Sequence, residues 1–185
     1  LVGALIYTFS DTFWFSAVEG EVYAMSSLFT AIVFWAMLEW EEEAHQPYAN
    51  RWIVLIAFLM GLSIGVHLLN LLTIPAMVFL YYFKMYEVTA KRTWKVLFIA
   101  VAILAFILFG MIPYIPKFSA YADLLFVNLL GLPVNSGATC FMLMLIGLGV
   151  WGFYYTYKRA KVLLNTIILC FTMIVIGYST FAVVV

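Results

Sequence analysis

Long uninterrupted runs of apolar residues constrain the fold of this chain more than any other feature. The run VLFIAVAILAFILFGMI, residues 96–112, holds 17 residues without a charged side chain. A helix needs about 20 such residues to cross the hydrocarbon core of a bilayer. Charged residues make up only 10% of the chain and hydrophobic residues 67%, and a transmembrane barrel would instead need strict apolar–polar alternation. The sequence therefore predicts an all-α, polytopic membrane protein.

About seven segments are apolar enough to be spans, some of them short or broken: residues 1–8, 22–38, 52–64, 71–83, 96–112, 138–155 and 162–177. Neither a linker nor an internal repeat divides them, so we expect residues 1–185 to form a single transmembrane domain. The chain begins and ends inside apolar runs, which predicts an excerpt of a longer polypeptide. Gly61 and Gly65 predict close helix packing, and Cys140 and Cys170 are expected to be buried.

Residues 52–83 hold no formally charged side chain, and they are long for one span but short for two. They could form one tilted helix, or two short helices that meet at residues 65–70. A break would place eight of the nine basic residues on one side, and Lys and Arg accumulate in cytoplasmic loops. We therefore predict the break, with cytoplasmic loops at 39–51, 84–95 and 156–161 and outer segments at 10–21, 65–70 and 113–137.

The outer segment 113–137 contains Pro113, Pro116 and Pro133. Proline lacks an amide proton and clashes with the preceding helical turn, so this segment is not expected to be one uninterrupted helix. Within it, residues 121–130 are amphipathic and predict a short helix along the membrane interface.

Three carboxylates stand among aromatic residues near the start of the chain: Asp11, Glu19 and Glu21. On a helix, Asp11 and Glu19 would share a stripe close to Tyr23, and Glu21 would point the opposite way. A helix over residues 12–40 would be about 43 Å long, so its acidic end would project beyond the lipid. Ionisable residues at membrane depth are candidates for function. We expect Glu19 and Glu21 to line a site, with Asp11 and Tyr23 as weaker candidates.

The predicted helix break carries His67 and Asn70. Broken helices turn their freed backbone groups toward a cavity. A histidine there can donate a hydrogen bond to a phosphate, and an asparagine can orient a sugar hydroxyl. Alternatively, both side chains pair with the carbonyls that the break releases.

Weaker candidates on the same predicted side are Asp123, Asn128 and Asn135. The sequence contains no metal-ligand cluster and no nucleotide-binding motif. With a net charge of zero, it gives no sign of a nucleic-acid partner.

Three strings carry a resemblance to a known family: SDTFWFSAVEGEVYAMSSLFTA, RWIVLIAFLMGLSIGVHLLNLLTIPAMVFLYYF and FVNLLGLPVNSG. They closely resemble a family of Gram-negative multispan proteins, formerly a domain of unknown function and now placed among GT-C glycosyltransferases. A eukaryotic relative of that family is a protein O-mannosyltransferase of the endoplasmic reticulum. The resemblance implies a GT-C helical bundle in the bacterial inner membrane with its active face toward the periplasm. It also implies inverting transfer of a sugar, with mannose as a candidate, from a polyprenyl-phosphate donor to Ser or Thr hydroxyls of exported proteins.

The resemblance implies roles for single residues as well. GT-C enzymes usually carry the catalytic carboxylate on the first outer loop, so the general base is expected upstream of Leu1. Glu19 or Glu21 would then position the acceptor or a divalent cation, and His67 with Asn70 would hold the departing lipid phosphate. Related transferases place a lysine near the position of His67.

Two other classes of protein remain open. A polytopic transporter or a flippase for lipid-linked sugars would also use broken helices and intramembrane carboxylates. A non-catalytic membrane scaffold would need no site.

Overall fold

The computed structural model of the chain describes residues 1–18 and 22–182, and these residues form helices with no strand. The elements are α1 (Val2–Thr8), α2 (Asp11–Val18), α3 (Tyr23–Glu43), α4 (Asn50–Ile64), the 3₁₀ helix η1 (Leu68–Leu72), α5 (Thr73–Met85), α6 (Ala90–Ala105), the π-helical η2 (Phe106–Met111), α7 (Ile112–Leu130), α8 (Ser136–Lys158) and α9 (Val162–Ala182). Five helical stretches are long and apolar enough to cross a membrane, and α4 is a shorter apolar helix. The all-α, polytopic prediction is confirmed.

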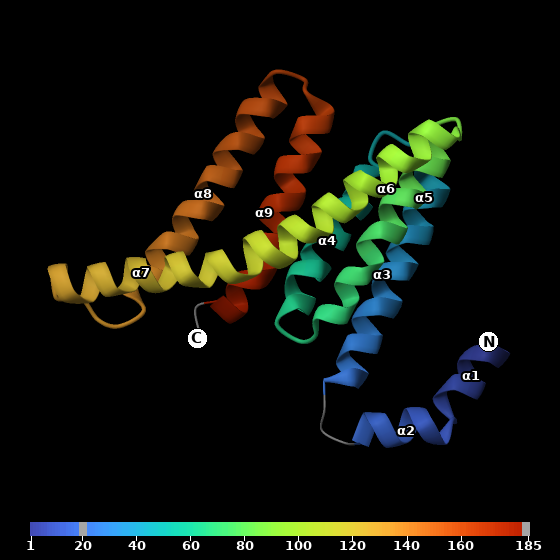
Figure 1. Cartoon of the computed structure of the whole chain (residues 1–185), viewed down its shortest axis with the longest axis horizontal. Helices are drawn as coiled ribbons and strands as arrows, with labels where there is room; N and C mark the ends of the chain where they lie inside the picture. The colour runs from blue at the N-terminus through green and yellow to red at the C-terminus, as the bar shows by residue number, and fades with distance from the viewer. Residues whose placement is uncertain (19–21, 183–185) are drawn as a thin grey trace.

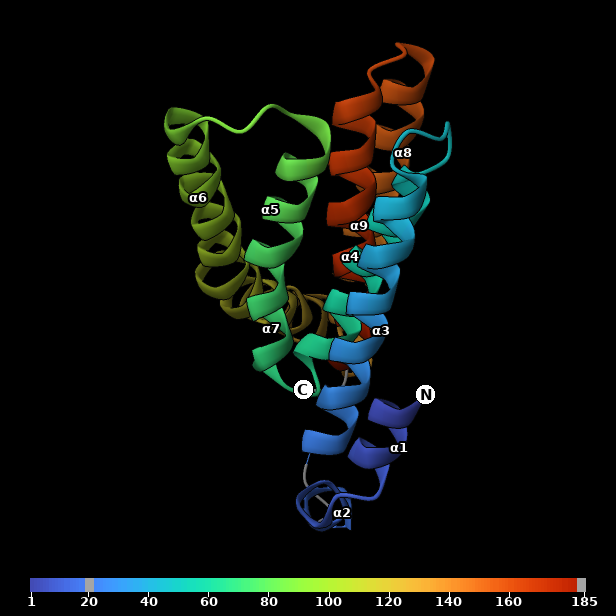
Figure 2. The same ribbon diagram turned by 90° about the vertical axis from the view of Figure 1, so that its right-hand side faces the viewer.

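The helices form a bundle with two distinct ends (Figures 1 and 2). The α3–α4, α5–α6 and α8–α9 loops lie together at one end, which we call the basic end. Eight of the nine basic residues lie in or beside these loops: Arg51, Lys84, Lys91, Arg92, Lys95, Lys158, Arg159 and Lys161. Element η1, the start of α3 and the end of α9 lie at the other end, which we call the break end. The predicted break between α4 and α5 is therefore confirmed.

The centre of the bundle is the crossing of α4 and α9, where glycine allows close approach. A methyl group built on Gly61 would overlap the carbonyl oxygen of Ile174, and one built on Gly177 would overlap that of Phe58. Small residues are the usual means of bringing helices together in lipid, where apolar burial alone gives little driving force. Gly61 thus packs helices as predicted, but its partner in the crossing is Gly177, and Gly65 is exposed.

The segment 113–137 is not one uninterrupted helix, as predicted, but the interruption lies at residues 131–135 and not at the first two prolines. Residues 113–130 belong to one helix, α7, that continues α6 through η2. Pro113 lies in the first turn of α7, and Pro116 lies inside the helix. In a regular α-helix, the Pro113 ring would crowd the carbonyl of Phe109. Phe109 lies in the π-helical η2, where the amide of Ile112 donates to the carbonyl of Ile107, five residues back. The wider π turn accommodates Pro113 and keeps the helix continuous.

A hydroxyl from α9 replaces the hydrogen bond that Pro116 cannot make. In an α-helix, the carbonyl of Ile112 accepts from the amide of residue 116, which here has no proton. The Tyr178 hydroxyl donates to that carbonyl at 3.1 Å. An unpaired carbonyl at membrane depth is costly, so Tyr178 compensates for the proline and joins α9 to α7.

The start of the chain also differs from its prediction. The helix over residues 12–40 is absent, because α2 ends at Val18 and α3 begins at Tyr23. Helix α2 lies across the end of α3 rather than along its axis (Figures 1 and 2).

The cysteines were expected to be buried, and this was wrong for Cys140. Cys140 is exposed on α8, and Cys170 is half-buried on α9. A surface that faces lipid needs no polar side chains, so an apolar segment does not by itself imply burial within the protein.

We predict that Tyr178→Phe destabilises the full-length protein in detergent by about 1 kcal/mol, because it leaves the Ile112 carbonyl unpaired. Tyr121→Phe, which alters an exposed tyrosine on α7, should have no measurable effect on the unfolding midpoint. Pro116→Ala restores the missing amide proton, so Tyr178→Phe should cost less than half as much in that background. An equal cost in both backgrounds would show that Tyr178 does not compensate for Pro116.

Candidate functional site

The chain between α4 and α5 changes direction through an extended residue, His67. Its backbone angles are φ −161° and ψ 134°, and it is the residue that caps η1. The Nδ1 atom of its ring accepts a hydrogen bond from the Leu69 amide at 3.1 Å. When Nδ1 of a neutral imidazole accepts, the ring proton is on Nε2. The break therefore presents Nε2–H of His67 as a hydrogen-bond donor.

An aromatic side chain from the start of α3 contacts this histidine. The rings of Tyr23 and His67 lie 5.7 Å apart between centroids and are tilted by 42°. Tyr23 is exposed and His67 is half-buried. The fold thus joins two predicted candidates from separate helices at the break end, and each has a polar group that can face a ligand.

Asn70 lies behind this pair and is almost fully buried, with 1% of its surface exposed. The Thr30 hydroxyl lies 2.9 Å from the Ser26 carbonyl and 3.2 Å from the Asn70 side-chain oxygen. A hydroxyl has one proton to donate, so both bonds are satisfied only if the Asn70 amide is turned over and donates to Thr30. In either orientation, one polar atom of the Asn70 amide lacks a partner among the described residues. Asn70 therefore links the break to α3, and one polar atom of its side-chain amide stays free to form a further hydrogen bond.

Two hydroxyls pair with carbonyls beside the break. Ser63 donates to the Met60 carbonyl at 2.9 Å, and Thr73 donates to the Asn70 carbonyl at 2.7 Å. The side chains of His67 and Asn70 donate to no carbonyl among the described residues, so the structure does not show the alternative in which both pair with released carbonyls. Sequence reasoning missed Ser63, Thr73 and Thr30, although a Ser or Thr hydroxyl that can bond a carbonyl three or four residues back is a usable signal.

The weaker candidates Asp123 and Asn135 form a helix cap at a different place. The Asp123 carboxylate accepts the amides of Asn135 and Gly137, each at 3.0 Å, and so holds the start of α8 against α7. Asn128 is exposed on α7. The α7–α8 junction lies far along the molecule from η1 (Figure 1), so the fold does not bring these three residues to His67.

The acidic candidates are placed only in part. Asp11 is exposed in the first turn of α2. Glu19 and Glu21 lie outside the described residues, so their assignment to the site stays a prediction. Within residues 1–18 and 22–182, no three His, Cys, Asp or Glu side chains are grouped to hold a metal ion.

One comparison with known proteins finds a match, in the N-terminal part of the chain. Residues 1–90 match a family model described as the Protein O-mannosyl-transferase TMEM260 N-terminal domain. This confirms the predicted resemblance to membrane protein O-glycosyltransferases over those residues. No curated protein and no solved structure matches the chain. The matched range contains Tyr23, His67 and Asn70 but not the α7–α8 junction.

We predict that the two ends of the bundle lie on opposite sides of the membrane. In the full-length protein with Cys140 and Cys170 replaced by alanine, His67→Cys should react with a membrane-impermeant maleimide from outside intact cells. Lys91→Cys should react only after permeabilisation, because short basic loops stay in the cytoplasm. Labelling of both positions from the same side, or of position 67 from neither side, would contradict this arrangement.

Proposed function

We propose, from the match of residues 1–90 to the N-terminal domain of a protein O-mannosyl-transferase family, that this chain is part of a membrane glycosyltransferase. It moves a sugar, in our proposal mannose, from a polyprenyl-phosphate donor to Ser or Thr hydroxyls of exported proteins on the extracytoplasmic side. The observation that carries the proposal is the helix break at His67, which presents an N–H donor beside Tyr23 at the end of the bundle away from the basic loops.

The reaction in this proposal is an inverting transfer of GT-C type. The acceptor oxygen attacks the anomeric carbon as the bond from that carbon to the phosphate oxygen breaks, and a general base takes the acceptor proton. Negative charge then grows on the departing phosphate. A donor aimed at that charge lowers the barrier, because its interaction is stronger in the transition state than in the ground state. We assign this role to Nε2–H of His67.

The residues around His67 have supporting roles in the proposal. Tyr23 packs on the imidazole and limits its rotation, and Asn70 holds the break against Thr30 of α3. Glu19 and Glu21 stand four and two residues before Tyr23 in the sequence, and we assign them to positioning the acceptor hydroxyl or a divalent cation. We assign the general base to a carboxylate outside this chain.

The transporter interpretation finds less support. A path for a sugar needs polar groups along its length, but the cavity that reaches toward the basic end is lined mainly by Met, Ile, Leu and aromatic side chains. His67 and Asn70 do not line it.

The test uses the full-length protein, a polyprenyl-phosphate mannose donor and a Ser/Thr-containing acceptor peptide. His67→Ala should lower kcat by about 100-fold, the usual loss when one donor to a developing negative charge is removed. His67→Gln, which keeps an N–H donor, should retain more activity than His67→Ala.

The matched control is His45→Ala, since His45 is exposed in the α3–α4 loop at the basic end. It should transfer sugar at the unaltered rate. Equal kcat for the His67→Ala and His45→Ala variants, at equal thermal stability, would reject the role of His67. If Glu19→Ala and Glu21→Ala also left transfer unchanged, the scaffold interpretation would be favoured.

A further inference from the structure

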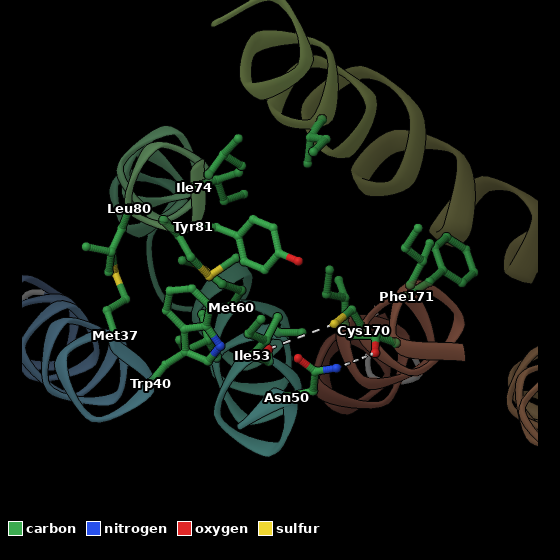
Figure 3. A pocket seen from close by; sticks show the side chains of 18 of the residues that line it. Met37, Trp40, Asn50, Ile53, Met60, Ile74, Leu80, Tyr81, Cys170 and Phe171 are labelled. Atoms are coloured by element: carbon green, nitrogen blue, oxygen red, sulfur yellow. Dashed lines mark hydrogen bonds between the residues drawn. The ribbon is translucent and has the colours of Figure 1, made fainter. Parts of the chain in front are cut away.

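An apolar cavity of about 660 Å³ lies between α3, α4, α5, η2 and α9 (Figure 3). Side chains such as Ile53, Met60, Ile74 and Phe171 line it. Its volume is within the range of about 300–1,000 Å³ that is typical of ligand sites. Trp40, Asn50 and Tyr86 line it where α3 ends, α4 begins and α5 ends, so the cavity reaches toward the basic end.

Polar atoms face this apolar space at that end. Trp40 is 3% exposed, and its indole Nε1–H has no hydrogen-bond partner within the described part of the chain. In Figure 3 this nitrogen points toward Asn50, and the Tyr81 hydroxyl points into the cavity. The Asn50 side-chain amide donates to Thr166 at 3.1 Å, which leaves its oxygen as an acceptor. A buried donor without a partner is costly, so Trp40 indicates an occupant that carries a hydrogen-bond acceptor.

A second, smaller pocket adjoins the first through Tyr86. It has a volume of about 300 Å³ and is lined by Tyr82, Tyr86, Arg92, Lys95 and Val96. On α6, the first pocket reaches Ile103, seven residues from Val96, which corresponds to about 10 Å along a helix. The basic pocket therefore lies nearer the loops, and the apolar cavity lies deeper.

The charge at this end is positive where the second pocket lies. Arg51 pairs with Glu43 at 2.8 Å, and Lys84 pairs with Glu41 at 3.2 Å. Arg92 and Lys95 form no ion pair within the described ranges, although Arg92 donates to the Glu87 carbonyl at 3.4 Å. Two cations beside an apolar cavity are complementary to an anionic head group with an attached hydrocarbon chain.

We propose that the two pockets form a binding site for one anionic glycerophospholipid of the leaflet at the basic end. One acyl chain fills the apolar cavity, an ester oxygen accepts from Trp40 Nε1–H, and the phosphate lies at Arg92 and Lys95. This site is distinct from the sugar-donor site proposed at the break end. Basic pockets between membrane helices are known to hold anionic head groups.

The chemistry of the two linings favours a lipid over a protein helix or a free anion, because one molecule has to fill an apolar cavity and meet two cations beside it. A free phosphate would satisfy Arg92 and Lys95 but would leave the apolar cavity empty.

The test is photo-crosslinking of the full-length protein in phosphatidylcholine vesicles. The probes are phosphatidylglycerol and phosphatidylcholine that carry the same diazirine on one acyl chain. Phosphatidylglycerol should label peptides of α5, α6 and α9 at least five-fold more strongly than phosphatidylcholine. Arg92→Gln with Lys95→Gln should lower that labelling by about five-fold or more, since it removes both cations of the second pocket.

The matched control is Lys158→Gln with Arg159→Gln, which removes the same charge at the α8–α9 loop and should lower labelling less than two-fold. Trp40→Phe keeps most of the packing and should lower labelling about three-fold. Equal labelling by both lipids, equal losses in the two charge variants, or no label in α5, α6 and α9 would overturn the proposal. The last outcome would indicate that another protein segment fills the cavity. Sugar transfer is not part of the readout, so the two proposals fail independently.

Discussion

Every backbone amide and carbonyl at membrane depth must find a partner inside the protein, and this requirement decides where the chain can depart from regular helix. The break between α4 and α5 is possible because Ser63 and Thr73 pair with neighbouring carbonyls and His67 pairs with the Leu69 amide. The prolines of α7 are possible because η2 widens the preceding turns and Tyr178 supplies the proton that Pro116 lacks. Each irregularity is therefore tied to side chains that cannot change freely.

The break links this backbone requirement to function. A continuous helix over residues 50–85 would bury His67 and Asn70 in its middle, whereas the break brings His67 to the end of the bundle beside Tyr23. It also sends α5 back toward α3 and α4, where Tyr81 stacks on Trp40 at 5.2 Å between ring centroids. One structural feature thus shapes both the proposed sugar-donor site at the break end and the proposed lipid site toward the basic end.

Several features were predictable from the sequence because they depend on composition and loop charge alone. The apolar segments, the break near His67 and the shared side of the basic loops belong to this group. The continuity of α7 was not predictable, because the carbonyl that Pro116 leaves without a donor is paired by Tyr178, which is 62 residues away from Pro116 in the sequence. The role of Asp123 as the cap of α8 was not predictable either, because the sequence alone does not distinguish a carboxylate that caps another helix from one that binds a ligand. The Asn70–Thr30 contact likewise joins residues 40 positions apart, and no local pattern marks it.

The central claim is that the donor phosphate binds at the helix break, at the end of the bundle opposite the basic loops. The most direct measurement is an experimental structure of the full-length protein with a non-hydrolysable polyprenyl-phosphonate sugar bound. We predict a phosphonate oxygen within hydrogen-bonding distance of Nε2 of His67, about 3 Å, with the Asn70–Thr30 contact kept. A phosphonate bound at the α7–α8 junction or among the basic loops, with His67 free of ligand, would contradict this account.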